Sequence, residues 1–316
     1  MSEETSEREA LLELLKENIR EQRRARRWRL ITRGAVLAIV VLVAISLGRF
    51  DFAAEEEVGP HTAEVRIDGP IMSDSAASAE QVIRGLERAF EADDVAGVVL
   101  RINSPGGSAV HSRQIFQEIQ RLRDEHDEIP VHAVIEDVGT SGAYYVAAAA
   151  DQIHVNESSI VGSIGVIMGS FGIGEALEKL GIERRIYTAG EDKAFLDPFA
   201  PEKEEHVEHV RTMLDDIHGQ FIAAVRAGRG EQIDDAGADE DRLFSGLIWT
   251  GQQSLEKGLA DEIGSVRSVA RDVIGEEELI DYTARRDFLS QLAERFGTAV
   301  GQGAYQALQS LEYQPR

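Results

Sequence analysis

The stretch VAGVVLRIN, Val95–Asn103, runs directly into SPGGS, Ser104–Ser108. A short run of mostly apolar residues ending in such a turn predicts a strand that is buried on both faces. The two glycines allow backbone N–H groups to approach a ligand with no Cβ in the way, and such groups can hold a developing oxyanion. Because an ordinary strand-to-helix turn uses the same residue types, this stretch alone leaves its role open.

A second stretch of this kind is GTSGAYYVAAAAD, Gly139–Asp151, which follows a predicted strand at Val131–Glu136. If the next helix begins near Ser141, the serine hydroxyl lies where N–H groups and the helix dipole favour negative charge. A serine at this place also suits a simple N-cap. Successive parallel strands end at one edge of a sheet, so we expect the hydroxyl beside the glycine amides, as acyl transfer requires.

Strands and helices alternate along the chain, which predicts an α/β fold with right-handed crossovers and a largely parallel, buried sheet. Active sites of such folds gather at strand ends. The further elements that we predict are a strand at Thr62–Ile71, a serine-capped helix at Ser78–Asp93, a helix at Ser112–His126, a helix at Ser141–Ala150, a strand at Gly165–Ser170, a helix at Ile173–Gly181, a strand at Glu183–Gly190, a long helix from about Pro201 to Ala227, and a turn, a helix ending near Gly258 and a short strand within Leu247–Gly264.

The composition is strongly acidic, with 57 Asp and Glu against 33 Lys and Arg and a formal net charge of -24. Nucleic acid is therefore not an expected partner, because binding it needs basic residues that displace phosphate counterions. Only five of the basic residues are lysines, and an acidic, lysine-poor surface predicts a halophilic source, with a merely acidic surface domain as the alternative. There is no cysteine, which excludes thiol catalysis and disulfides.

The segment Leu30–Gly48 is predominantly apolar and, at about 20 residues, is long enough to cross a bilayer. The arginine-rich Arg20–Arg29 precedes it, so the positive-inside rule places the N-terminus in the cytoplasm and the large remainder of the chain outside, in a single-pass cell-membrane protein. A cleaved signal peptide is the rival interpretation. The predicted organisation is a charged cytoplasmic arm at 1–29, a transmembrane anchor at 30–48, a linker at 49–61, the main domain at 62–285, and a helical or flexible tail at 286–316.

A nucleophilic serine needs a base. The nearest histidines are His111, His132 and His154, but no fixed spacing supports them, and we interpret all three as structural. Lys193 is the other choice, because it follows a predicted strand in a glycine-containing segment of a chain that has few lysines.

Four ordered stretches resemble successive motifs of the signal peptide peptidase A family, which are membrane-anchored Ser–Lys proteases. They are RINSPGGSAVHS (Arg101–Ser112), GTSGAYYVAAAAD (Gly139–Asp151), VGSIGV (Val161–Val166) and AGEDKAFLDPFAPE (Ala189–Glu202). The resemblance spans about residues 63 to 282. It implies a Clp protease/crotonase-like fold with a parallel β-sheet and ββα-type units, preceded by one transmembrane helix.

The resemblance also implies roles for individual residues. Ser141 would be the nucleophile and Lys193 the general base, with Ser163 helping to position the lysine. The oxyanion donors would be the backbone N–H groups of Gly107 and Gly142, in a turn that Gly106 shapes. It further implies homo-oligomers in which serine and lysine come from neighbouring subunits, peptide substrates such as signal-peptide remnants, and no metal or cofactor.

The lysine must be neutral to act as a base. Lowering the pKa of a lysine by about 3 units requires about 4 kcal/mol of discrimination against its charged form, which apolar burial supplies. Glu191 and Asp192 precede Lys193 and favour the ammonium, so the dyad requires both carboxylates to face solvent.

Three alternatives remain at this point. A crotonase-type enzyme would use the paired glycine N–H groups on acyl-CoA but gives Ser141 and Lys193 no joint role. A membrane-bound protease of the stomatin-cleaving type would have the same dyad and a different target. A catalytically inactive anchored scaffold would keep the fold alone.

Overall fold

The computed structural model describes residues 23–24, 26–39, 59–235 and 240–284. The chain divides into two units, Met1–Val58 and Gly59–Arg316. In the first unit the described residues, 23–24 and 26–39, are helical with exposed side chains. No helix of the described residues combines the length and apolarity needed to cross a membrane. Residues 40–48 of the predicted anchor, the predicted arm up to residue 22 and the predicted tail at 286–316 lie outside the described residues.

In its described residues the second unit contains an eight-stranded sheet, in the order β6-β5-β3-β2-β1-β8, with β4 and β7 attached beside β3. Neighbouring strands are parallel except for the β5–β6 pair. The predicted parallel sheet is thus confirmed. The strands are β1 (His61–Asp68), β2 (Val95–Ser104), β3 (Val131–Thr140), β4 (Gln152–Val155), β5 (Ile160–Gly162), β6 (Ile248–Thr250), β7 (Glu262–Ile263) and β8 (Leu279–Asp281).

Strand β3 has two partners on its outer side. Its first half, from His132 to Ile135, pairs with β4, and its last three residues pair with β5. On the inner side it pairs with β2 as far as Ser104, which lies opposite Gly139. The carboxyl ends of β2, β3 and β5 therefore meet at one edge.

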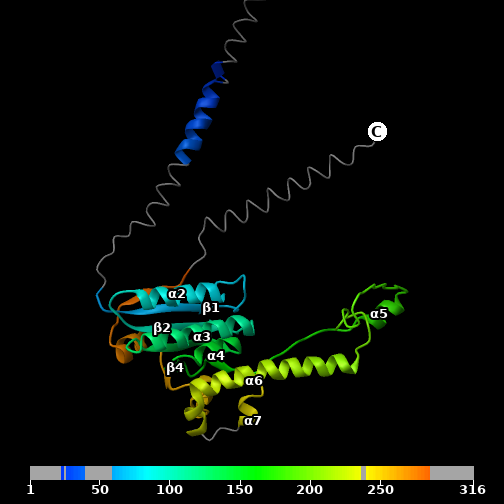
Figure 1. Ribbon diagram of the computed structural model, residues 1–316. Coiled ribbons are helices and arrows are strands. Elements are labelled where there is room, and N and C mark those ends of the chain that lie inside the picture. Colours follow the sequence, from blue (N-terminus) through cyan, green and yellow to red (C-terminus); the bar gives the residue numbers. More distant parts are fainter. Residues whose placement is uncertain (1–22, 25, 40–58, 236–239, 285–316) are drawn as a thin grey trace, which may run out of the picture. The chain divides into compact units, whose positions relative to one another are not determined.

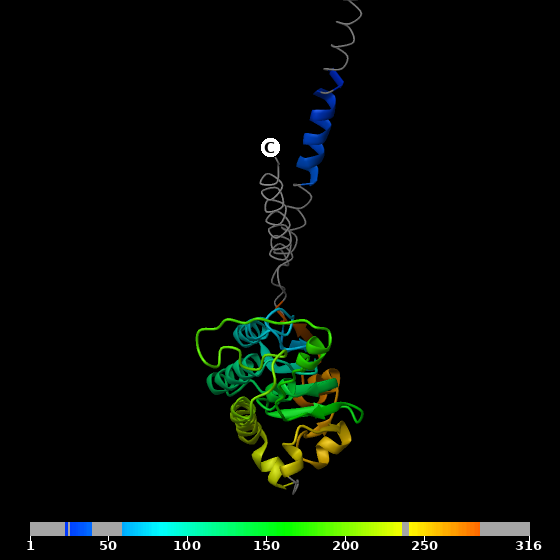
Figure 2. The same cartoon turned by 90° about the vertical axis from the view of Figure 1, so that its right-hand side faces the viewer.

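Most helices cover one face of the sheet, where the main hydrophobic core lies (Figures 1 and 2). The other face carries a small cluster of Val99, Val134 and Val269. The helices are α2 (Ala79–Glu91), α3 (Ala109–Glu125), α4 (Gly142–Ala147), α5 (Gly174–Lys179), α6 (Glu204–Asp235), α7 (Glu240–Leu243), α8 (Gly251–Glu256), α9 (Val266–Ser268) and the π-helix η1 (Val269–Ile274).

The strand predictions at 62–71, 95–103 and 131–136 are confirmed, with shifted ends. Helix α3 begins three residues before the predicted Ser112, because the Ser108 hydroxyl accepts from His111 N–H and caps it there. Ser78 does precede α2, but its side chain makes no capping hydrogen bond.

Two predicted strands are wrong: residues 165–170 and 183–190 have no strand structure. Both segments carry apolar side chains that are exposed, with Ile167 at 91% and Tyr187 at 90%. A strand needs a hydrogen-bonded neighbour, and the described residues of this chain give these segments none.

Arg229 fixes the carboxyl-terminal part of α6 to the rest of the domain. Its side chain is fully buried, and its guanidinium forms two hydrogen bonds with the Asp261 carboxylate, at 2.8 and 2.9 Å. It also donates to the Gly258 carbonyl oxygen. Asp261 in turn accepts from the Ile153 N–H of β4. The ion pair therefore joins α6 to the edge of the sheet.

We expect Asp261→Ala to lower the free energy of unfolding by about 3–5 kcal/mol, because it leaves a buried guanidinium without its counter-charge. The double variant R229M/D261A should recover part of this loss, since it removes the unpaired charge as well. Urea denaturation of the three proteins measures both effects. A single variant as stable as the parent would contradict the argument.

His132 and His154 form a second buried polar pair, on β3 and β4, with ring nitrogens 3.3 Å apart. Burial lowers the pKa of both imidazoles, and the proximity of His154 lowers the pKa of His132 further. Both are structural, as predicted. Because the folded chain resists protonation here and the unfolded chain does not, this pair removes stability as the pH falls below about 6.5.

The variant H132Q/H154Q should therefore lose less unfolding free energy than the parent between pH 7 and pH 5. Chemical denaturation across that range tests this, with H126Q, a change at a partly exposed histidine, as the control. Equal slopes for the parent and the double variant would show that the pair does not titrate as described.

Candidate active site

The turns after β2 and β3 are in direct backbone contact. A Cβ at Gly106 would lie 2.5 Å from Gly142 N, 2.6 Å from Thr140 O and 2.9 Å from Ser141 Cβ. Gly106 has φ of +90°, which also favours glycine. The predicted meeting of the two turns is confirmed, and only a residue without a side chain fits at Gly106.

Ser141 stands alone between β3 and α4 in a strained conformation. Its φ and ψ are 53° and -126°, a region that costs about 1–3 kcal/mol for a residue with a side chain. Its N–H donates to the Gly162 carbonyl at 2.8 Å, which holds the turn against β5. Its side chain makes no capping hydrogen bond to α4. Ser141 thus occupies the N-cap position of α4 but its hydroxyl does not cap the helix, and strain of this kind clusters at functional sites.

Two backbone donors lie beside this hydroxyl. Gly142 N is the first N–H of α4, and a Cβ on Gly142 would lie 3.2 Å from Gly107 N. Within the described part of the chain neither N–H group donates a hydrogen bond to protein. Two neighbouring N–H groups without a protein acceptor among the described residues are donors that can receive a developing oxyanion.

Ser163 is the residue after Gly162, whose carbonyl accepts the Ser141 N–H. It also has a positive φ, 54°, and its N–H donates to Leu247 O at 2.7 Å. The VGSIGV motif thus lies directly against the Ser141 turn. The hydroxyl of Ser163 makes no hydrogen bond with any residue that the structure describes, so it is available to another group.

A pocket with apolar and aromatic walls opens at Ser141. The Tyr145 ring stacks on Phe221 of α6 at 4.8 Å and contacts Phe116 edge-on. Burial raises the pKa of the Tyr145 phenol, so it stays neutral. The pocket is lined by Gly107, Ala109, Ser141, Gly142, Tyr145, Gly165, Val166, Ile167, Ile217 and Phe221.

Lys193 does not reach this pocket in the single chain. It lies in the turn of residues 191–196, with an exposed side chain, on the segment that joins α5 to α6. Figure 1 shows this segment and α5 beyond the amino end of α6, apart from α2, α3 and α4. The described residues contain four lysines. Three have a partner: Lys179 and Lys203 form ion pairs, and the Lys257 amine lies over the Trp249 ring. The Lys193 amine forms no ion pair or ring contact with any described residue.

His111 makes a structural contact between two helices. Its Nδ1 accepts from Ala79 N–H at 3.2 Å, which holds α2 against α3. This agrees with the structural interpretation from sequence.

The pocket walls were missed by sequence reasoning. Tyr145 lies four positions after the predicted helix start, in an aromatic pair that the sequence shows. Ile217 and Phe221, however, lie on α6, more than seventy positions away. Helical periodicity marks them only as apolar, and nothing in it gives the helix a place beside Ser141.

Comparison with known proteins agrees with this geometry. A family model described as peptidase family S49 matches residues 123–279. The chain is 31% identical over 203 residues to a putative protease of Synechocystis sp., covering 64% of this chain and 69% of that one. It is 31% identical over 198 residues to a putative signal peptide peptidase SppA of Enterococcus faecium, covering 63% of this chain and 56% of the other.

A higher identity, 42% over 218 residues, is found with a Brucella abortus protein named as the Na(+)/H(+) antiporter NhaA. That match covers 67% of this chain but only 29% of the Brucella protein. The chain thus spans from under a third to just over half of these two relatives from Brucella and Enterococcus.

The tight packing of the two turns can be tested at Gly142. A Cβ there would lie 2.3 Å from Ser112 Oγ but 3.4 Å from Ser112 Cβ. We expect Gly142→Ala to cost about 1–3 kcal/mol of stability by overpacking, and Ser112→Ala to restore most of it in the double variant. Gly107→Ala should find no such rescue, because its Cβ would meet the backbone oxygen of Ile71 at 2.3 Å. Thermal unfolding measures each variant, and additive losses in G142A/S112A would contradict this packing.

Proposed function

The chain belongs to peptidase family S49, with relatives of the signal peptide peptidase type, and from this premise we propose that it is a membrane-associated serine protease with Ser141 as nucleophile. One observation carries the proposal. Ser141 has a strained backbone and a hydroxyl that does not cap α4, and it lines an apolar pocket together with Gly107 and Gly142, whose N–H groups have no acceptor among the described residues.

We further propose that the base is Lys193 of a second copy of the chain. The amine has no partner among the described groups of its own chain and lies on a segment with exposed apolar side chains, including Phe171 and Leu180, each 72% exposed. Packing this segment against another copy would bury these side chains and desolvate the lysine. Ser163, with its free hydroxyl beside the Ser141 turn, would then receive the amine.

The reaction proceeds in two halves. The neutral lysine takes the Ser141 proton while Oγ bonds to the peptide carbonyl carbon, and the Gly107 and Gly142 N–H groups hold the oxyanion. Collapse of this intermediate breaks the C–N bond, and the lysine donates its proton to the leaving amine. Water, activated by the lysine, then hydrolyses the acyl-enzyme.

The apolar pocket favours peptides with an apolar side chain beside the scissile bond, such as remnants of signal peptides and other membrane-derived peptides. We place the N-terminus in the cytoplasm and the peptidase domain outside, on an anchor at residues 30–48. A protease of the stomatin-cleaving type differs only in target, and comparison of the two peptide classes as substrates separates them. A crotonase-type enzyme would retain activity without the Ser141 hydroxyl.

Ser141→Ala and Lys193→Ala should each lower hydrolysis of an apolar fluorogenic peptide by at least about 1,000-fold, because each removes one half of the proton transfer. The full-length protein in detergent and molar salt is the sample. The parent rate should also rise with pH as the lysine deprotonates. Full activity in S141A would end the proposal, and an inactive parent would favour the scaffold alternative.

Mixing the two inactive variants tests where the lysine comes from. If serine and lysine come from neighbouring copies, co-assembled S141A and K193A should regain about a quarter of the parent activity, since a random site then combines two intact residues once in four. Pairing within one chain predicts no recovery. Each variant mixed with itself is the control.

A further inference from the structure

The turn that carries Lys193 is docked on the amino end of α6. Asp192 Oδ1 lies 2.9 Å from His206 Nε2. The Phe195 ring packs edge-on against the rings of His206, at 5.1 Å, and His209, at 5.7 Å. Lys193 is thus bracketed by two neighbours that both contact α6. The His206 side chain is only 13% exposed, whereas that of Asp192 is 62% exposed.

The turn is also closed on itself. Lys193 N–H donates to Gly190 O and Phe195 N–H to Asp192 O. Leu196 adopts a positive φ of 55° at its end, and Asp197 forms an ion pair with Arg184. Because of these contacts, we expect Lys193 to change position only when the whole turn moves.

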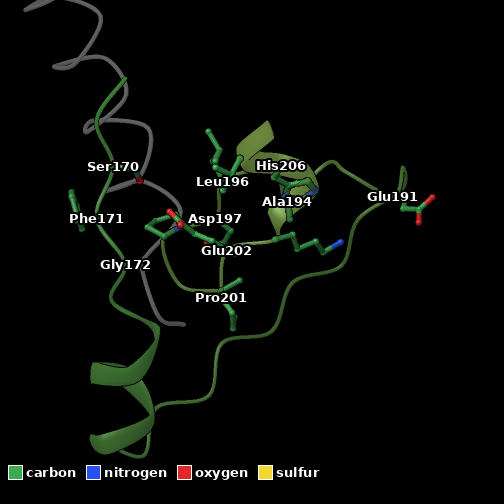
Figure 3. Close-up of a pocket in the computed structure, with 14 residues that line it drawn as sticks. Ser170, Phe171, Gly172, Glu191, Ala194, Leu196, Asp197, Pro201, Glu202 and His206 are labelled. Atoms are coloured by element: carbon green, nitrogen blue, oxygen red, sulfur yellow. The ribbon is translucent and has the colours of Figure 1, made fainter. Parts of the chain in front are cut away.

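Several charged side chains surround His206. It faces Asp192 and Glu205, whose ligand atoms lie within 4.8 Å of its own, and Lys203 and His209 lie nearby. The hydrogen bond from His206, with the charges of His206, Lys203 and His209, lowers the pKa of the Asp192 carboxyl. Asp192 is therefore a carboxylate directed at His206. Figure 3 shows Glu191 pointing away from His206.

A metal ion is a weaker interpretation of the same group. The Lys203 amine lies 3.6 Å from Glu205 Oε1, and the group sits at the positive end of the α6 dipole. Both positive potentials oppose a cation. They favour instead the carboxylate form of Asp192.

Resting on the role proposed above for Lys193, we propose that His206 is a positioning residue for the reaction. It binds the Asp192 carboxylate and packs on Phe195, which directs the neighbouring negative charge away from Lys193 and fixes the turn for presentation to the second copy. The Asp192 side chain is 62% exposed, and among the described residues its carboxylate bonds to His206 and forms no ion pair with Lys193.

His206→Phe keeps an aromatic ring against Phe195 and removes the hydrogen bond. The released Asp192 should then favour the ammonium, so the rising limb of kcat/KM should move to higher pH by about one unit, roughly a tenfold loss of rate below the limb. Adding Asp192→Asn should return the limb to its place. His206→Gln retains a donor and should shift little. His209→Gln removes a ring contact to Phe195 and the smallest charge contribution to Asp192 but keeps the His206–Asp192 hydrogen bond, so it should shift the limb far less than H206F.

A second readout does not depend on catalysis. Limited trypsin digestion of the full-length protein should cut after Lys193 several-fold faster in H206F than in the parent, while cleavage after Arg185, outside the docked turn, stays constant. This separates two failures. A parent whose peptidase activity does not need Lys193 refutes the proposed function, whereas an unchanged Lys193-to-Arg185 cleavage ratio refutes the docking.

Three results would overturn the positioning role. One is a pH profile of H206F that coincides with the parent. Another is a shift that persists in H206F/D192N. The third is a parent that loses activity to a chelator and regains it with added divalent cation while H206F is unaffected by either, which would assign Asp192, Glu205 and His206 to a metal site.

Discussion

The close approach of two backbone turns is the constraint on which the site depends. Gly106 lies so near Gly142 N and Thr140 O that any side chain would push the turns after β2 and β3 apart. The parallel register of β2 and β3 brings the two turns to one edge, and the absence of Cβ atoms lets them touch. The N–H groups of Gly107 and Gly142 and the Ser141 hydroxyl are thereby brought to one pocket, and the two N–H groups need no side chain to place them.

The rest of the domain holds that contact in place. Ser141 keeps its strained conformation because Gly162 accepts its N–H from one side and Gly106 packs against it from the other. Helix α6 supplies Phe221 to the pocket wall, and the buried Arg229–Asp261 pair fixes the same helix to the edge of the sheet. Interactions far from the site thus offset the conformational strain at Ser141.

Sequence patterns predicted the features that depend on local chemistry. The parallel sheet, the strands at 95–103 and 131–136 and the meeting of the two glycine turns all follow from apolar runs and turn residues, which act over a few positions. Pocket residues on α6 depend on where a distant helix packs, and periodicity carries no such information. The segments 165–170 and 183–190 have strand-like composition, but composition cannot supply a pairing partner.

The position of Lys193 is a further feature that sequence patterns could not predict. Its segment has exposed apolar side chains and an amine without a partner among the described groups of the chain, whereas the turn that bears it is bonded within itself and docked on α6. The turn thus holds Lys193 in a defined position although its amine contacts no other described group, and we interpret this as one half of an interaction. The other half that we propose is the Ser141 pocket, which has two N–H donors and a serine hydroxyl, while its lining contains no basic side chain among the described residues. Under our proposal, pairing of two copies would complete both sites, because each copy would then supply what the other lacks.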